Sequence, residues 1–160
     1  MGDAPQWHWQ AWRPGDRAED AVRAWLAPCL GCDAASVMLA RDVHGRPRLA
    51  PEHGFDAGWS HSGGGLLVAC GRDVVLGVDL EREHVRPRAL ELARRFFHPR
   101  EAAWLEAQAE AARAPAFLRL WCAKEAVLKA HGRGLAFGLD RLAFAERDGR
   151  LVLVEADAAR

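Results

Sequence analysis

The sequence predicts an α+β fold with two similar α+β lobes. Predicted strands and helices do not alternate strictly: a strand and a helix come first, then strands, then helices and strands again. The chain has 160 residues, 50% of them hydrophobic, which suffices for one globular unit with a sizeable core. We therefore predict a single unit over residues 1–160, with an N-terminal lobe at about 1–75 and a C-terminal lobe at about 76–160.

The N-terminal lobe is predicted to begin with an edge strand and a helix. Trp7 and Trp9 alternate with polar residues ahead of a Pro-Gly turn, as in a strand. Asp16 is the expected N-cap of a helix over residues 17–30, and Gly31 is expected to end that helix. Further strands are expected at residues 36–40 and 66–70.

The C-terminal lobe is predicted to open on a strand that carries two acids. The apolar run 74–76 leads into Gly77–Glu81, a pattern typical of a buried strand. Pro99 and Pro115 are expected to separate three helices, at residues 89–97, 100–112 and 116–131. The Asp148-Gly149 pair predicts a hairpin between closing strands at residues 135–144 and 151–154.

Charge and cysteine content argue against several classes of function. Lys plus Arg equals Asp plus Glu at 22 each, so no global field favours nucleic acid or a membrane surface as a partner. No apolar run approaches 18 residues. Cys29 and Cys32 form a CxxC pair that lacks the second ligand pair of a zinc finger. We expect a monomeric protein of the reducing cytoplasm.

The segment WCAKEAVLK, residues 121–129, concentrates charge on the last predicted helix. Trp121, Glu125 and Lys129 recur at i, i+4 and i+8, so they share one side of the helix. Lys124 and Lys129 are the only lysines of an arginine-rich chain, which favours a specific role for them. The competing interpretation is a surface helix with one ion pair worth about 0.2–0.5 kcal/mol.

Two acids, Asp79 and Glu81, point to the same side of the predicted strand, because side chains alternate along a strand. Their repulsion would be relieved by a hard divalent cation, with Glu125 as the candidate third carboxylate. Mg2+ in such a site takes further ligands from phosphate, and Lys124 and Lys129 would neutralise that phosphate. The pattern predicts phosphoryl transfer or pyrophosphate binding.

Four motifs occur in an order and at a spacing known from one enzyme family. They are WSHSGG at 59–64, GVDLE at 77–81, RRFFHPREAAWL at 94–105 and FLRLWCAKEAVLKAHGRGL at 117–135. Over roughly residues 16–155 the chain resembles the 4'-phosphopantetheinyl transferases, and the surfactin-synthetase-activating type more than the short trimeric holo-acyl-carrier-protein synthases. The resemblance implies the fold of that family, a pseudodimer of two similar α+β lobes with the coenzyme in the cleft between them.

The same resemblance implies an enzyme that transfers 4'-phosphopantetheine from coenzyme A to a serine of an apo acyl, aryl or peptidyl carrier protein, with Mg2+ as cofactor. Asp79, Glu81 and Glu125 would hold the Mg2+. Lys124 and Lys129 would bind the diphosphate, and Lys129 would also act in catalysis. Glu125 would accept the proton of the serine, directly or through a water held by the metal.

Three further residues are assigned to coenzyme A by the resemblance. Ser60 and His61 would contact its 3'-phosphate. GRPRL at 45–49 resembles a GKP segment of the family, and Arg46 would accordingly contact the adenosine part. From the sequence alone, a surface histidine and a surface arginine are the competing interpretations of His61 and Arg46.

The sequence also departs from the family at both ends. Basic residues that larger relatives carry ahead of the helix at 17–30 are missing, and the chain stops before the additional C-terminal strands that the family leads us to expect. The alternative function is therefore a carrier-protein or coenzyme A binding module with impaired catalysis. A remoter alternative is an unrelated phosphate-binding regulator in which residues 121–129 form merely a packed helix.

Overall fold

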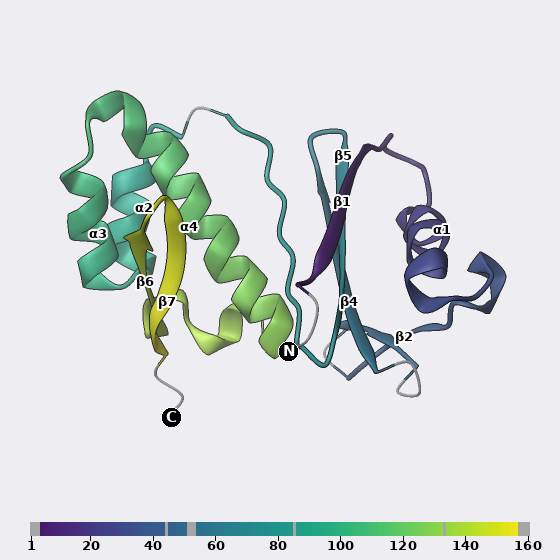
Figure 1. The fold of residues 1–160 in the computed structure, drawn as a ribbon. Coiled ribbons are helices and arrows are strands. Elements are labelled where there is room, and N and C mark those ends of the chain that lie inside the picture. The colour runs from purple at the N-terminus through teal and green to yellow at the C-terminus, as the bar shows by residue number, and fades with distance from the viewer. Residues whose placement is uncertain (1–3, 44, 51–53, 85, 133, 157–160) are drawn as a thin grey trace. The chain divides into compact units, whose positions relative to one another are not determined.

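The computed structural model describes residues 4–43, 45–50, 54–84, 86–132 and 134–156. The predicted α+β class is confirmed, because helices and antiparallel sheets make up the chain (Figure 1). Two compact units are present: unit 1 comprises residues 1–82 and 125–134, and unit 2 comprises residues 83–124 and 135–160. The second predicted lobe therefore differs from unit 2, since residues 76–82 and 125–134 pack within unit 1.

Unit 1 is built on an antiparallel sheet with the strand order β1-β5-β4. Its strands are β1 (Gln6–Ala11), β4 (Phe55–Ser62) and β5 (Gly65–Arg72). The first strand lies at an edge, as predicted. A separate hairpin pairs β2 (Leu39–Arg41) with β3 (Pro47–Leu49), and the 3-10 turn η1 (Ala34–Ser36) precedes it. The strand predicted at 36–40 therefore begins later than expected.

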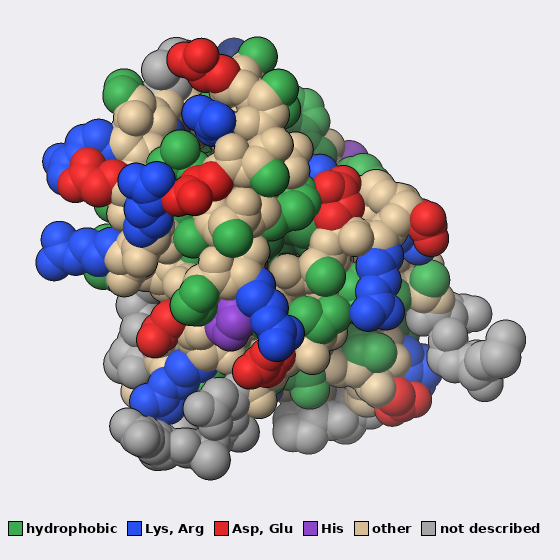
Figure 2. All heavy atoms as spheres, turned by 90° about the vertical axis from the view of Figure 1, so that its left-hand side faces the viewer, with side chains coloured by type: hydrophobic (Ala, Val, Ile, Leu, Met, Phe, Trp, Pro, Cys, Tyr) green, Lys and Arg blue, Asp and Glu red, His purple; other side chains and the backbone are tan. Residues whose placement is uncertain are grey.

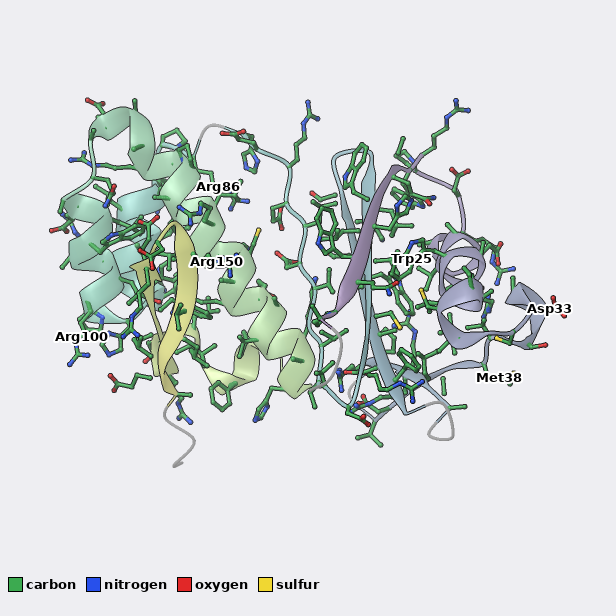
Figure 3. The ribbon with its side chains drawn as sticks, in the orientation of Figure 1. Trp25, Asp33, Met38, Arg86, Arg100 and Arg150 are labelled. Carbon is green, nitrogen blue, oxygen red and sulfur yellow. The ribbon has the colours of Figure 1, made fainter. Side chains whose placement is uncertain are left out.

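Helix α1 (Ala18–Leu30) covers one face of this sheet. Val22 and Leu26 are completely buried against the alternate residues Leu66 and Val68 of β5. Trp25 points toward the sheet in Figure 3 and stacks on His8 of β1. These alternating apolar side chains make the core of unit 1.

The two ends of α1 test the predicted caps. Gly31 ends the helix in the left-handed conformation, with φ 66°, as predicted. Asp16 is not the N-cap, which is Arg17; the Asp16 carboxylate instead accepts a hydrogen bond from the Arg13 N–H. The Asp16 side chain thus stabilises the Pro-Gly turn ahead of the helix and does not cap the helix.

The predicted strand over residues 74–81 is wrong, because residues 75–82 are irregular. This segment lies beside the face of β4 that is turned away from α1. Its backbone N–H groups use side chains of β4 as acceptors: Leu76 donates to Asp56 at 2.7 Å, and Arg82 donates to Ser62 at 3.0 Å. A side chain cannot continue a β-ladder, so two acids stand on an irregular segment and not on a strand.

Unit 2 contains three helical segments and a hairpin. The helical segments are α2 (Ala89–Phe96), α3 (Pro99–Glu106) and the first part of α4 (Glu110–His131). The hairpin strands are β6 (Leu142–Arg147) and β7 (Arg150–Ala156). The hairpin turn predicted at Asp148-Gly149 is confirmed, with φ 50° and 75° at the two residues. Phe97 and Trp121 each stack on the buried Phe117 ring. Arg86, labelled in Figure 3, has its guanidinium 5.9 Å from the Phe117 ring centroid.

Two boundaries in unit 2 differ from the prediction. Pro115 lies inside α4 and does not separate two helices. It is the sixth residue of the helix, so the missing N–H costs a single hydrogen bond near the N-terminal end. Most of the strand predicted at 135–144 is instead occupied by the 3-10 turns η3 (Gly134–Phe137) and η4 (Leu139–Arg141). Gly138, at φ 94°, separates these turns.

The surface that carries α2 and α3 has mixed charge. Acidic and basic side chains are interspersed on the face drawn in Figure 2. Arg94 of α2 pairs with Glu106 of α3 at 2.5 Å, and Arg88 pairs with Glu91 at 2.7 Å. Such exposed pairs contribute little to stability. Across the ranges that the structure describes, no helix combines the length and apolarity needed to cross a membrane.

Candidate functional site

Four of the predicted site residues meet in unit 1. The ammonium of Lys129, on the last turn of α4, lies 2.6 Å from Asp79 Oδ1 and 3.1 Å from Ser60 Oγ. The Ser60 hydroxyl also lies 3.4 Å from Asp79 Oδ1. Glu125 stands one helical turn before Lys129 and interacts electrostatically with both Lys129 and Asp79. Strand β4, the irregular segment and α4 each contribute to this group.

The surroundings of the Glu125 carboxyl group raise its pKa. Burial raises its pKa above the ordinary value, and the negative charge of Asp79 raises the pKa further. Lys129 opposes these two effects, and Glu81 adds to the rise. Glu125 therefore holds a proton more readily than an exposed glutamate does, and a cation placed between the carboxylates would reverse that preference.

Two carboxylate oxygens of this group are buried without a hydrogen-bond donor. Among the described residues, no donor reaches Asp79 Oδ2 or Glu125 Oε1. An unpaired buried acceptor is costly, so native proteins rarely leave one without a reason such as an ion or a catalytic role. A hard cation with oxygen ligands fits these two atoms.

The fit to Mg2+ is incomplete in one respect. In the part of the chain that the structure describes, no three His, Cys, Asp or Glu side chains are arranged so that they could hold a metal ion. The ammonium of Lys129 contacts Oδ1 of Asp79, in the place where a bound metal ion would be expected. The predicted ligands Asp79, Glu81 and Glu125 thus supply suitable atoms, but they are not gathered around one point.

Gly77 brings the acidic segment against α4. A Cβ atom at this position would lie 1.6 Å from the carbonyl oxygen of Ala126 and 2.8 Å from the backbone nitrogen of Ala130. The contact is therefore backbone against backbone, which only glycine permits. Asp79 follows Gly77 by two residues, so this contact brings Asp79 within reach of Lys129. Lys129 in turn lies one helical turn after Glu125.

Replacement of Gly77 by alanine should disrupt unit 1. The methyl group cannot fit unless the segment and the end of α4 separate, so we expect a loss of about 3 kcal/mol or more in the free energy of unfolding. Urea denaturation followed by circular dichroism measures this loss. Gly58→Ala is the matched control, because its Cβ would come no closer than 3.2 Å to the Val78 side chain and 3.7 Å to the Val78 backbone nitrogen. Equal effects of both substitutions would contradict the proposed contact.

A cavity of about 280 Å³ in unit 1 adjoins this group. Its wall includes Lys129 and Arg46, two of the residues predicted to bind coenzyme A, together with Arg41 and Trp59. Arg46 is buried, pairs with Asp56 and donates to the Leu76 carbonyl at 2.9 Å. Its Nη1 has no acceptor among the residues described. The cavity thus offers cations and a spare donor to an anionic or polar ligand.

His61 does not join these residues. It is exposed and stacks on Trp12 with the ring centroids 4.2 Å apart. Ser60 and His61 are neighbours on β4, so their side chains leave the strand on opposite faces. The structure therefore brings Ser60 to Lys129 and leaves His61 elsewhere on unit 1. Its contact with a 3'-phosphate stays a prediction.

Lys124 lies in the core of unit 2, away from the surface. Its ammonium is completely buried, pairs with Glu101 at 2.6 Å, and donates to the carbonyls of Leu139 and Leu142. Burial lowers the pKa of Lys124, and Glu101 opposes this effect. All three N–H donors of the ammonium are used inside the protein, so these contacts give Lys124 a structural role.

Glu101 is the residue that sequence reasoning missed. Its carboxylate forms an ion pair with Lys124. It also accepts hydrogen bonds from two backbone N–H groups, those of Phe144 at 2.8 Å and His98 at 3.0 Å. The sequence signal was the capping box at the start of α3, in which Glu101 stands three residues after the N-cap His98. Histidine at the N-cap concealed it, because Ser or Thr is usual there.

The comparisons with known proteins agree with the resemblance. The family model of the 4'-phosphopantetheinyl transferase superfamily matches residues 75–158, more than half of the chain. A Synechocystis protein named as a candidate 4'-phosphopantetheinyl transferase is 35% identical over 76% of this chain and 50% of its own length. The 4'-phosphopantetheinyl transferase HetI of Nostoc is 37% identical over 72% of this chain and 50% of its own length. The one named Sfp of Bacillus subtilis is 30% identical over 74% of this chain and 52% of its own length.

The chain spans about half the length of these curated relatives. The matched segment contains Asp79, Glu81, Glu125 and Lys129, so the acidic group and its lysine fall inside the region that defines the family. The chain belongs to the 4'-phosphopantetheinyl transferase superfamily.

Proposed function

We propose that this protein transfers 4'-phosphopantetheine from coenzyme A to a serine hydroxyl of an apo carrier protein and releases adenosine 3',5'-bisphosphate. The observation that carries the proposal is the group of Asp79, Glu125 and Lys129 beside a cationic cavity. Anionic oxygens without donors, an ammonium and a spare guanidinium donor lie within one unit. A diphosphate with its metal ion has the complementary charge.

Each residue has a distinct part in the proposal. Asp79, Glu81 and Glu125 would hold Mg2+, which when bound neutralises charge on the diphosphate. Lys129 donates to diphosphate oxygens, where negative charge grows as the pyrophosphate bond breaks. Glu125 would accept the proton of the attacking serine, directly or through a water held by the metal. The metal would lower the pKa that burial and Asp79 raise in the ligand-free protein, which weakens Glu125 as a direct base.

The cavity receives the nucleotide part of coenzyme A in this proposal. Arg46 lines the cavity and has an unused donor, and Trp59, which also lines it, has an aromatic ring that suits a purine. Lys124 is left out, because its donors are already used within unit 2. The expectation of a monomer in the reducing cytoplasm is kept in this proposal; the four cysteines, which form no disulfide, suit a reducing compartment.

Incubation with coenzyme A, Mg2+ and an apo carrier protein tests the proposal directly. Mass spectrometry of the carrier should show the addition of one phosphopantetheine group, and chelation of divalent cations should prevent it. Acyl, aryl and peptidyl carrier proteins are to be tried in parallel. A carrier that stays apo in every case, while other transferases modify it, contradicts the proposal.

A binding module without catalysis is the second candidate. The observation that favours it is the metal arrangement, since Lys129 and not a set of three ligands faces Asp79 in the described residues. Such a module would be stabilised by coenzyme A or by the carrier protein, yet would leave the carrier unmodified. Thermal unfolding with and without each ligand is therefore run beside the transfer assay. Stabilisation, about 2.7 kcal/mol for a ligand at 100 times its Kd, together with a carrier that stays apo, identifies the binding module.

A paired change of protein and ligand tests the assignment of His61. If His61 contacts the 3'-phosphate, His61→Ala should weaken binding of coenzyme A but barely affect binding of 3'-dephospho-coenzyme A. The two losses should then not add, with a coupling of about 0.5–3 kcal/mol for groups in contact. Titration calorimetry measures all four affinities. Losses that add to within about 0.5 kcal/mol would place the 3'-phosphate elsewhere.

A further inference from the structure

Lys129 contacts the very carboxylate that is expected to hold the metal. Its ammonium lies 2.6 Å from Asp79 Oδ1, while Oδ2 of the same carboxylate is buried without a donor among the described residues. The Asp79 side chain is only 6% exposed, so its negative charge is poorly solvated. Lys129 thus supplies the compensating charge in the ligand-free protein.

The two members of this pair differ in their freedom to move. The Lys129 side chain is 42% exposed, whereas Asp79 is enclosed by Ser60 and by the contact of its segment with α4. A lysine has four rotatable bonds and a compact charge, so it can leave one anion for another at low cost. Lys129 also lines the cavity, whose wall includes Gly77 and Val78 of the segment that carries Asp79. An anion in that cavity is therefore within reach of the ammonium.

We propose that Lys129 is an internal counter-cation that couples metal binding to diphosphate binding. Without a diphosphate, Lys129 neutralises Asp79 and competes with a divalent cation for Oδ1. When a diphosphate occupies the cavity, the ammonium turns to it, and Oδ1 becomes available to the metal. The inference rests on the proposed function for the nature of the anion, and it concerns the order and the cooperativity of binding.

Two consequences follow from this exchange. A divalent cation alone should bind weakly, because it must displace a cation that is already in place. Coenzyme A and the cation should strengthen each other's binding, and this coupling is reciprocal by thermodynamic necessity. Lys129 would thus keep the carboxylates neutralised and disfavour metal binding until the substrate arrives.

Removal of the competing ammonium is the test. Lys129→Met in the full chain should bind Mn2+ about tenfold more tightly than the unsubstituted protein in the absence of coenzyme A. Titration calorimetry or the electron paramagnetic resonance of free Mn2+ measures this affinity without any reliance on turnover. Lys129→Arg keeps the cation and should retain the weak Mn2+ binding. Lys129→Gln serves as a second neutral variant of more polar character.

Arg48→Met is the matched control for charge, since Arg48 pairs with Asp42 in the same unit and takes no part in the site. It should leave the Mn2+ affinity unchanged. An unchanged or weaker Mn2+ affinity in both neutral variants of Lys129, or an equal gain in Arg48→Met, overturns the inference. The proposed function is judged separately, by transfer to an apo carrier protein: an active wild type with unaltered Mn2+ affinity in the variants refutes the coupling alone.

Discussion

Asp79→Asn should abolish phosphopantetheine transfer while leaving the fold intact. The amide retains the size of the carboxylate but loses the negative charge that pairs with Lys129 and that, in the proposed function, holds the metal. Loss of a central electrostatic contact typically costs about 100- to 1,000-fold in turnover, and removal of a metal ligand should cost at least that much. The rate of mass increase of an apo carrier protein at saturating coenzyme A and Mg2+ measures the effect.

Asp20→Asn provides the control for this substitution. Asp20 lies exposed on α1, and its carboxylate makes a long contact of 3.4 Å with Arg23. The substitution removes the same charge as Asp79→Asn does. It should transfer at the rate of the unsubstituted protein. Near-normal turnover of Asp79→Asn in Mg2+ would show that the carboxylate is not needed, and the assignment of the acidic group would fall with it.

Lys124→Met should destabilise the protein severely, because the ammonium of Lys124 pairs with Glu101 inside unit 2 and does not serve the diphosphate as the sequence predicted. The substitution leaves the Glu101 carboxylate buried without its counter-ion, a defect that costs about 3–5 kcal/mol. Urea unfolding gives the loss as a fall in the midpoint. The double variant Lys124→Met, Glu101→Gln should lose less than the sum of the two single losses, because neither charge is then left alone.

The alternative for Lys124 makes the opposite prediction. A lysine that serves mainly to bind phosphate would leave stability almost unchanged when replaced, and coenzyme A affinity would fall instead. Additive losses in the double variant would also contradict a direct ion pair. The pair is therefore tested without any assay of catalysis.

Periodicity predicted part of the site well. Spacing of four residues on a helix predicted that Glu125 and Lys129 are neighbours, and the acidic Asp79 lies with them in the structure. Periodicity could not show that residues 75–82 are irregular, because their backbone is satisfied by the Asp56 and Ser62 side chains of a strand distant in sequence. Apolar residues next to two acids look like a strand even when, as here, Val75 is 70% exposed.

The misplacement of Lys124 has a different cause. A helix that packs on several sides carries apolar residues all round, so its pattern does not tell which polar residue faces inward. The buried partner Glu101 comes from another helix, and the carbonyl acceptors of Leu139 and Leu142 come from a turn and a strand end. Long-range acceptors of this kind leave no mark on the local sequence.

Helix α4 begins in unit 2 and ends in unit 1, and this division bears on how the protein can be dissected. Residues up to Lys124 belong to one unit, and residues from Glu125 belong to the other. The peptide chain therefore passes between the units at 82–83, 124–125 and 134–135. An excised fragment of residues 1–82 would carry Asp79 but neither Glu125 nor Lys129, so no single cut yields an autonomous half that contains the acidic group with its lysine.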